Sequence, residues 1–489
     1  MIKARVPAAG AAGPGLGYDS PMPSIRLLVR RCARAALPAV LAAASALAGA
    51  TAPAAPPPPS APASPVVQAA SAPEADDRSN MSASARRIYD VARPRLLQVR
   101  TLLRDQDSQA SVGSGSLVGA GGLILTNYHV VSQIALEPTR YRLSFQTADG
   151  QSGPLQLIAF DVVHDLALVR MTTPPANIVA RGWFEFRPAG TPPPSQGERI
   201  FSLGNPLDIG FAVVEGTYNG LVERSFLPQI LFSGSLNPGM SGGPVLDDRG
   251  RVVGVNDATR RDGQQVSFLV PAEFAQALIT RGATAKPITA AVESELARQL
   301  LEHQKALATR FLALPWREVK YSHYGVPVPQ EEFMRCWGSS TPTDAKGLQF
   351  ERSDCQMDTA IFVSQSLRTG DLSVRHEVYD GHKLGALRFS QQYSLSFQNE
   401  GMGRRTRDLT APSCKEDFVE NAGLPMRTVM CLRAYRRLPG LYDVAVLTTS
   451  VDAKTEGVQG RFDAHGVSFA NALLLASHYL QGFAWKRSP

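Results

Sequence analysis

The stretch NPGMSGGP at residues 237–244 places one serine inside a turn that is rich in glycine. Glycine adopts backbone angles that other residues avoid, so the chain can bend sharply on both sides of Ser241. Such a bend brings main-chain N–H groups close to the group that the serine attacks, as an oxyanion hole requires. Ser241 is therefore a candidate nucleophile, although turns of this kind are also common in ordinary loops.

Two candidate partners of this serine stand upstream. His129 follows the apolar run at residues 123–125, so we expect it at the end of a strand. Asp165 precedes the apolar segment 166–169. A single histidine or aspartate in such a place is more often structural. The order His, Asp, Ser along the chain is, however, that of chymotrypsin-like double β-barrels, and it differs from the subtilisin-like and α/β-hydrolase orders.

With these motifs in place, residues 85–285 resemble the trypsin-like protease domain of the HtrA/DegP family. The matching blocks, in chain order, are GSGS at 113–116, the His129 motif, Asp161 ahead of Asp165, LGNP at 203–206, the serine turn, GVN at 254–256 and SFLVP at 267–271. The resemblance implies a mainly β fold, with a chymotrypsin-like double six-stranded antiparallel β-barrel. It also implies an endopeptidase whose triad is His129, Asp165 and Ser241, with Gly239 and Ser241 donating backbone N–H groups to the oxyanion.

This triad explains how a serine hydroxyl, a poor nucleophile at neutral pH, would cleave an amide. His129 accepts the hydroxyl proton and returns it to the leaving amine, while Asp165 orients the imidazole and stabilises the imidazolium. We expect no metal and no cofactor. The eight histidines show no spacing typical of a zinc site.

Two positions depart from the family pattern. Met240 precedes the nucleophile where HtrA proteins usually carry asparagine, so this side chain cannot form a strong hydrogen bond there. Ser235, six positions before the nucleophile, is expected at the base of the specificity pocket, with Leu236, Phe268 and Leu269 nearby. Because no carboxylate stands at this base, we expect modest apolar side chains rather than arginine or lysine in the pocket.

The N-terminal region has the composition of an export signal. Most of the formal charge of +7 comes from basic residues among residues 1–50, so little of it is left to favour nucleic acid as a partner. Arginines precede an apolar run at 35–50 that ends in small residues, which predicts a cleaved signal peptide over residues 1–50. Residues 51–80 are rich in Pro, Ala and Ser and read as a disordered linker. We therefore expect a periplasmic or secreted protein of a Gram-negative-type envelope.

The rest of the chain divides into three predicted parts. The protease domain is expected over residues 82–285, and proline and glycine mark a short helix from Pro271 to near Gly282. A connecting helix is expected over 286–315. Its apolar positions fall on one face of a helix and read as packing surface: Val292, Leu296, Leu300, Leu307 and Phe311.

Residues 316–489 show no feature of the PDZ domains that usually follow in HtrA proteins. They read as an α+β domain whose strands include 374–379, a second strand over 387–397 after the turn at Asp380-Gly381, and 442–449. A closing helix is expected over 469–483. In an exported chain the even number of cysteines here predicts two disulfides, and of three possible connectivities we favour the local one: Cys336 with Cys355, and Cys414 with Cys431.

These observations predict an exported serine endopeptidase that cleaves unfolded or exposed protein segments through an acyl-enzyme. Its partners would be protein or peptide substrates, and a homotrimer is implied only by the resemblance. The alternative is an envelope binding or scaffold protein with an inactive barrel, since a fold does not by itself prove a function.

Overall fold

The computed structural model describes residues 82–188, 190–259, 265–397, 402–451 and 454–486. The predicted signal peptide at residues 1–50 and the linker at 51–80 lie outside the described residues. Within those that are described, no helix combines the length and the hydropathy needed to cross a membrane.

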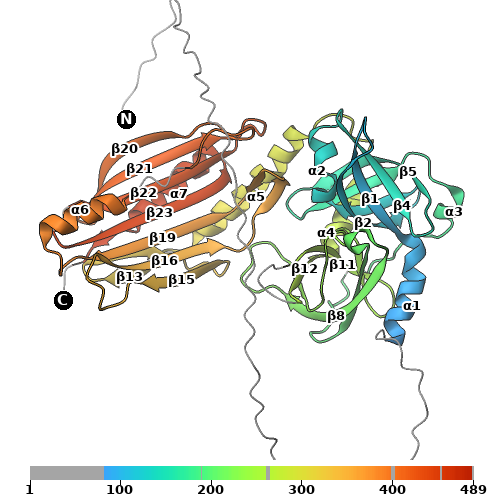
Figure 1. Ribbon diagram of the computed structural model, residues 1–489, viewed down its shortest axis with the longest axis horizontal. Helices are drawn as coiled ribbons and strands as arrows, with labels where there is room; N and C mark the ends of the chain where they lie inside the picture. Colours follow the sequence, from blue (N-terminus) through green and yellow to red (C-terminus); the bar gives the residue numbers. More distant parts are fainter. Residues whose placement is uncertain (1–81, 189, 260–264, 398–401, 452–453, 487–489) are drawn as a thin grey trace, which may run out of the picture. The chain divides into compact units, whose positions relative to one another are not determined.

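The first barrel is closed and has six antiparallel strands, in the order β1-β2-β3-β6-β5-β4 (Figure 1). Its strands are β1 (Leu96–Leu103), β2 (Gln109–Gly119), β3 (Leu123–Asn127), β4 (Tyr141–Thr147), β5 (Ser152–Asp161) and β6 (Leu166–Met171). The alternation expected of a half-buried strand is visible in β4, where Leu143 and Phe145 are buried. Gly150 closes the following turn with a positive φ of 85°.

The second barrel is also closed and six-stranded, in the order β10-β11-β12-β9-β8-β7. Its strands are β7 (Arg199–Gly204), β8 (Ala212–Leu221), β9 (Ile230–Phe232), β10 (Pro244–Leu246), β11 (Val252–Thr259) and β12 (Ser267–Pro271). A buried cluster joins residues of both barrels, among them Leu125, Leu168 and Val255. The predicted double six-stranded barrel is thus confirmed.

Short helices precede, connect and follow the barrel strands, and the longest helix comes after the barrels in the chain. They are α1 (Ala83–Ala92), η1 (Arg93–Arg95), α2 (Tyr128–Leu136), α3 (Ala176–Val179), η2 (Pro206–Asp208), α4 (Ala272–Gly282) and α5 (Glu293–Ala313). The start and end predicted for α4 from proline and glycine agree with the structure.

Helix α5 belongs to two hydrophobic cores. Leu296 and Leu300, near its N-terminal end, pack in the core of the first barrel. Leu307 and Phe311, near its C-terminal end, pack in the core of the sheet that follows. The predicted domain limits at residues 285 and 315 stay predictions, because one helix serves both cores.

The C-terminal part is built on a seven-stranded antiparallel sheet, in the order β15-β16-β19-β23-β22-β21-β20. These strands are β15 (Met334–Ser340), β16 (Gln349–Met357), β19 (Leu372–Asp380), β20 (Ser413–Asn421), β21 (Leu424–Ala434), β22 (Tyr442–Ser450) and β23 (Glu456–Val467). A three-stranded sheet and a separate hairpin complete this part. They contain β13 (Arg317–Tyr321), β14 (Tyr324–Val328) and β24 (Ala484–Trp485), and β17 (Ile361–Ser364) and β18 (Leu367–Thr369).

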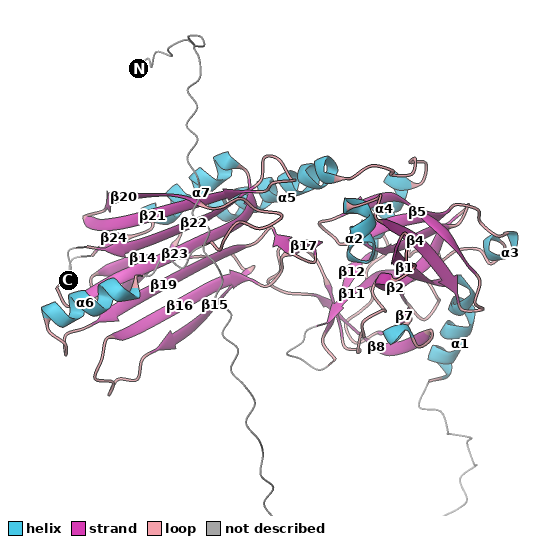
Figure 2. Ribbon diagram, turned by 45° about the horizontal axis from the view of Figure 1, so that its top comes forward, coloured by secondary structure: helices cyan, strands magenta, loops and turns pink. Residues whose placement is uncertain are grey.

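Two helices cover one face of the seven-stranded sheet. Helix α5 and α7 (Phe469–Gln481) pack on the face that carries Val444 and Val446 (Figure 2). The neighbouring residues Ala445 and Leu447 point to the opposite face, as alternation along a strand requires. The predicted closing helix is confirmed by α7.

The strand expected over residues 387–397 is wrong, because this segment forms helix α6 (Ala386–Ser396). Phe389 and Tyr393 lie one helical turn apart, stack with ring centroids 5.1 Å apart and are buried against Tyr379. Leu387 and Leu395 instead face solvent. Apolar residues alternate with polar residues in this segment, as they do in a half-buried strand. Only Phe389 and Tyr393, at positions i and i+4 of a helix, are buried in the core.

The two disulfides join directly opposed residues of neighbouring strands. Cys336 of β15 pairs in register with Cys355 of β16, and their sulfur atoms are bonded. Cys414 of β20 is likewise opposite Cys431 of β21 and bonded to it. Both are the local pairings expected from the sequence. Each ties an edge strand of the sheet to its only neighbour in that sheet.

Candidate active site

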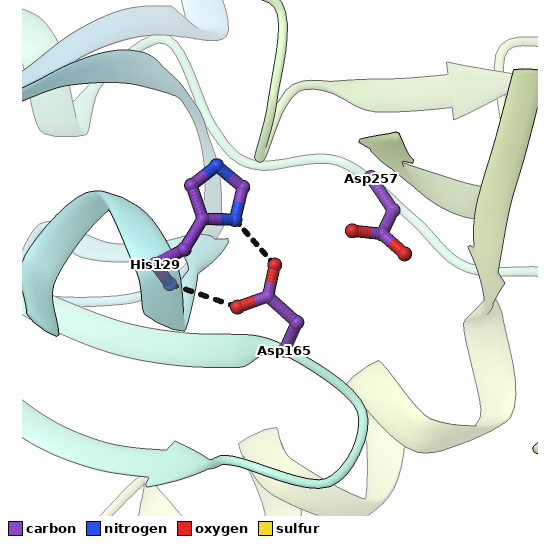
Figure 3. Close-up of side chains that lie close together, drawn as sticks. All are labelled: His129, Asp165 and Asp257. Carbon is purple, nitrogen blue, oxygen red and sulfur yellow. Dashed lines mark hydrogen bonds and ion pairs between the residues drawn. The ribbon is translucent and has the colours of Figure 1, made fainter. Parts of the chain in front are cut away.

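His129 is placed by the junction between a strand and a helix. Strand β3 ends at Asn127 and helix α2 begins at Tyr128, so His129 lies in the first helical turn. The imidazole Nδ1 is hydrogen-bonded to the Asp165 carboxylate, and the backbone N–H of His129 donates to Oδ1 of the same carboxylate at 2.8 Å (Figure 3). One carboxylate therefore fixes both the ring and the main chain of His129.

Asp165 is held by a tight turn ahead of β6. Its φ of 53° lies in the left-handed region, which aspartate tolerates better than most residues. Its carbonyl oxygen accepts hydrogen bonds from the backbone N–H of Tyr128 at 3.0 Å and from Asn127 Nδ2 at 2.8 Å. Asp161 stabilises the same turn, because its carboxylate accepts the backbone N–H of His164 at 3.1 Å. The turn thus aims the Asp165 carboxylate at α2.

The serine turn is fixed against the first barrel and needs its glycines. The backbone N–H of Ser114 donates to the Ser241 carbonyl at 2.8 Å, and the Ser114 hydroxyl donates to the Gly239 carbonyl at 2.7 Å. Gly239 has a φ of 95°, and a Cβ there would lie 2.4 Å from the carbonyl oxygen of Asn205. A Cβ on Gly242 would lie 2.4 Å from the Ser114 carbonyl. Substitution of either glycine would therefore displace the turn.

The Ser241 hydroxyl donates a hydrogen bond to the backbone carbonyl of Asp257 at 3.2 Å. Among the residues that the structure describes, it makes no hydrogen bond to His129. The side chain of the same Asp257 lies near the other two residues: its carboxyl group is within 4.8 Å of the His129 ring nitrogen and of the Asp165 carboxylate. His129 is thus paired with Asp165, and Ser241 is bonded to the main chain of Asp257, whose carboxyl group lies beside that pair.

Two backbone donors in the serine turn are available. In the described part of the chain, neither the N–H of Gly239 nor that of Ser241 donates to another protein group, whereas the intervening Met240 N–H is bonded to the Asn237 carbonyl at 3.0 Å. Two unengaged N–H groups, that of the candidate nucleophile itself and that of the residue two positions before it, are what a developing oxyanion requires.

The electrostatics of the site are set by carboxyl groups in close contact. Burial lowers the pKa of His129, but the charge and hydrogen bond of Asp165 outweigh this effect, so the pKa stands above its ordinary value. Burial, together with the negative charge of Asp165, raises the pKa of Asp257 to about 7. The side chain of Gln229 donates to Asp257 Oδ2 at 3.3 Å. Figure 3 shows the Asp257 carboxyl turned toward Asp165.

His129, Asp165 and Asp257 are also the one group among the described residues whose donor atoms lie close enough together to hold a metal ion. The Nδ1 atom that would serve as a ligand is already paired with Asp165. The absence of a metal from the reaction stays a prediction.

The predicted pocket residues fall in two different environments. Leu236 and Leu269 are buried in the core of the second barrel. Ser235 is exposed and Phe268 is half-buried, so these two remain able to contact a substrate. Leu236 and Leu269 can therefore affect the shape of a pocket only through the residues that cover them.

Met240 does not point toward the substrate side of the turn. Its side chain is fully buried among the apolar residues of the second barrel, while its carbonyl accepts a hydrogen bond from Asn256 Nδ2 at 3.1 Å. A methionine at this position therefore anchors the serine turn through packing, which replaces the polar contact that an asparagine would make.

Sequence reasoning missed three residues at this site. Asp257 directly follows the GVN block at 254–256, so the sequence could have indicated an acidic side chain near the site. Phe362 packs edge-on against the His129 imidazole, with ring centroids 6.0 Å apart, and Arg368 acts electrostatically on the same ring. No pattern in the sequence indicates that these last two residues lie there.

Comparison with known proteins finds similar peptidase sequences. Residues 113–255 match a family model described as a trypsin-like peptidase domain. The putative serine protease HhoA of Synechocystis is 31% identical over 35% of this chain and 42% of its own length. A probable periplasmic serine endoprotease DegP-like from Marinomonas is 29% identical over 36% of each chain.

Among solved structures, the serine endoprotease from Yersinia pestis matches 41% of this chain and 67% of its own chain, with 20% identity and a TM-score of 0.34. The chain spans about two fifths of the length of the curated relatives it matches. Residues 113–255 are thus similar to trypsin-like peptidase domains, and the chain resembles serine proteases of the HtrA/DegP type over this region.

Proposed function

We propose that this chain is a serine endopeptidase whose triad is His129, Asp165 and Ser241. The observation that carries the proposal is the double engagement of His129 by Asp165, at the place where the glycine turn presents Ser241. With Nδ1–H donated to Asp165, the ring keeps Nε2 as its proton acceptor. A structural histidine has no need of a nearby serine in a turn whose Gly239 and Ser241 N–H groups are free.

The proposed chemistry proceeds through an acyl-enzyme. Ser241 Oγ attacks the substrate carbonyl carbon as its proton passes to His129 Nε2. The resulting oxyanion accepts hydrogen bonds from the N–H groups of Gly239 and Ser241, each worth about 3 kcal/mol. His129 then gives the proton to the leaving amine as the C–N bond breaks. Water, deprotonated by the same ring, releases the acid and restores the Ser241 hydroxyl.

The observed Ser241 hydrogen bond represents a resting arrangement in this scheme. The hydroxyl donates to the Asp257 carbonyl, so it must rotate about χ1 to donate to His129. Serine χ1 has three staggered wells, so such a rotation moves the hydroxyl from one well to another. Hydrogen bonds of catalytic groups are often long or misaligned before substrate binds.

The substrates, location and assembly of the enzyme extend this proposal. We infer cleavage of unfolded or exposed protein segments, with Ser235 and Phe268 at a pocket for modest apolar side chains. The names of the DegP-like relatives, together with the N-terminal signal predicted from the sequence, support an envelope or secreted location. A homotrimer remains an inference from kinship.

A fluorophosphonate probe, which reacts only with an activated serine, tests the proposal. The purified wild type should be labelled, and Ser241→Ala should not. Ser152→Ala is the matched control, because this exposed serine stands at the start of β5, at the end away from the Asp165 turn, and should leave labelling intact. Degradation of denatured casein should follow the same pattern. A folded wild type that is neither labelled nor active would contradict the proposal.

A second candidate function is an envelope binding protein with an inactive barrel. The observation in its favour is the Ser241 hydroxyl, which is bonded to Asp257 rather than to His129. In that case Ser241→Ala would leave the affinity for a partner unchanged and neither protein would react with the probe. The two candidates therefore give opposite results in one experiment.

A further inference from the structure

The hairpin formed by β17 and β18, residues 361–369, is a two-stranded sheet of its own that lies outside the seven-stranded sheet. Three of its apolar side chains, Ile361, Val363 and Leu367, are buried in the core of the first barrel. The hairpin is therefore a piece of the C-terminal part that folds as a component of the protease.

This hairpin lies directly beside the catalytic imidazole. The Tyr128 hydroxyl of α2 donates to the Val363 carbonyl at 3.2 Å. The Phe362 ring meets the His129 ring in an edge-on contact, with an angle of 75° between the two planes. Phe362 is half-buried, so part of its surface stays available next to His129.

The rear of the hairpin is fixed to the C-terminal part. The Ser366 hydroxyl donates to Asp408 Oδ2 at 2.7 Å, and the Thr369 hydroxyl is hydrogen-bonded to the Tyr435 hydroxyl at 2.5 Å. The N–H of Gly370 donates to the His465 carbonyl at 3.1 Å. These bonds hold the position of the hairpin, which is thus set from both sides.

Arg368 brings an unpaired positive charge to this place. Its side chain is exposed, and its guanidinium lies over the Phe362 ring, 5.5 Å from the ring centroid. Among the described residues it forms no ion pair. Its charge lowers the pKa of His129, whereas the charges of Asp165 and Asp257 raise that pKa.

Resting on the proposed endopeptidase activity, we propose that the hairpin is a wall of the substrate cleft and that Arg368 selects polypeptides with an acidic side chain within two residues of the scissile bond. When the carbonyl carbon of a substrate reaches Ser241, the substrate residues next to the scissile bond lie along the imidazole of His129. Phe362 offers these residues an apolar surface. Arg368, stacked on that surface, offers the charge that a carboxylate would complement.

The test uses the full-length protein and a set of fluorogenic peptides that differ at one residue. Each position from two residues before to two residues after the scissile bond carries Glu, Gln or Lys in turn. For the wild type we expect kcat/KM for Glu to exceed that for Lys by at least about tenfold at one position, with a smaller ratio in high salt. Arg368→Gln should abolish the preference and Arg368→Glu should reverse it.

Arg388→Gln is the matched control, because it removes one exposed arginine charge from α6, away from the hairpin. A second readout is the pH profile of kcat/KM. Arg368 lowers the pKa of His129, so Arg368→Gln should move the acid limb to higher pH. This shift checks that the Arg368 charge lies near His129, whereas the ratio of kcat/KM for Glu and Lys peptides checks its contact with the substrate.

Fluorophosphonate labelling separates the two proposals. A folded wild type that is not labelled overturns the endopeptidase and, with it, this inference. A labelled wild type that cleaves Glu, Gln and Lys peptides equally, or an Arg368→Gln variant with unchanged preference, overturns the role of Arg368 alone.

Discussion

The two barrels contribute differently to the site and are stabilised by different neighbours. The first barrel supplies His129 and Asp165, and its core continues into α5 and the hairpin at 361–369. The second barrel carries Ser241 on a turn whose Met240 packs in a cluster made of second-barrel residues and that turn. The core behind His129 and Asp165 therefore extends into the C-terminal part, whereas the serine turn packs within the second barrel and is hydrogen-bonded to Ser114 of the first barrel.

The largest effect is expected from Asp165→Asn, which alters the first-barrel half alone. The amide has no negative charge to stabilise the imidazolium, and its NH2 group can hold the imidazole in the wrong tautomer, so kcat should fall by about 10⁴ in a peptide hydrolysis assay. The backbone carbonyl of Asp165 keeps its bonds to Tyr128 and Asn127, so the fold should persist in circular dichroism. A loss below tenfold would contradict the assigned role.

The connection between the two cores is tested on α5, where Leu296 packs with the first barrel and Leu307 with the C-terminal sheet. Each Leu→Ala variant should lose about 2–5 kcal/mol of unfolding free energy, because both side chains are fully buried. If one helix joins the cores, each variant should shift a single thermal transition that includes both parts. Two separate transitions, of which only one moves, would break the comparison.

In the second barrel, Met240→Asn restores the residue that is usual in the HtrA family. Because the side chain is fully buried among apolar neighbours, an unpaired amide there should cost about 1–3 kcal/mol of stability. Met240→Leu keeps the apolar volume and should cost less than about 1.5 kcal/mol. Chemical denaturation measures both variants. An equally stable Met240→Asn protein would show that packing does not anchor the turn.

The smallest effect is a pH shift from Asp257→Asn. Asp257 raises the pKa of His129, so the variant should move the acid limb of kcat/KM to lower pH, opposite to Arg368→Gln. Asp257 keeps its proton to about pH 7 when folded, but only to its ordinary value of 3.8 when unfolded. Its contribution to stability is thus present at low pH and lost as pH rises toward 7.

Measurements of Tm between pH 4 and pH 8 examine the same residue through stability. The wild type should lose stability across this range relative to Asp257→Asn, because an amide does not ionise. Parallel curves for the two proteins would mean that Asp257 does not hold its proton in the folded state.

Much of the fold and of the site was predictable because the signals are local. The serine turn, the helix signals around α4 and the opposed cysteines each depend on residues close in sequence. Segment 387–397 shows the limit of such signals, since its alternating apolar residues were equally compatible with a strand, and burial of Phe389 and Tyr393 decided for a helix.

What the sequence alone determined is the set of candidate reacting groups and the chain order that predicts a double barrel. What only the tertiary structure decided is their surroundings: the carboxyl of Asp257 near Asp165, Met240 inside the second barrel, and the hairpin against His129. Tyr128 and Val363, which join that hairpin to α2, are 235 residues apart. Contacts between residues so far apart in the chain arise from the packing of whole cores. They produce no periodic pattern in the sequence of either segment.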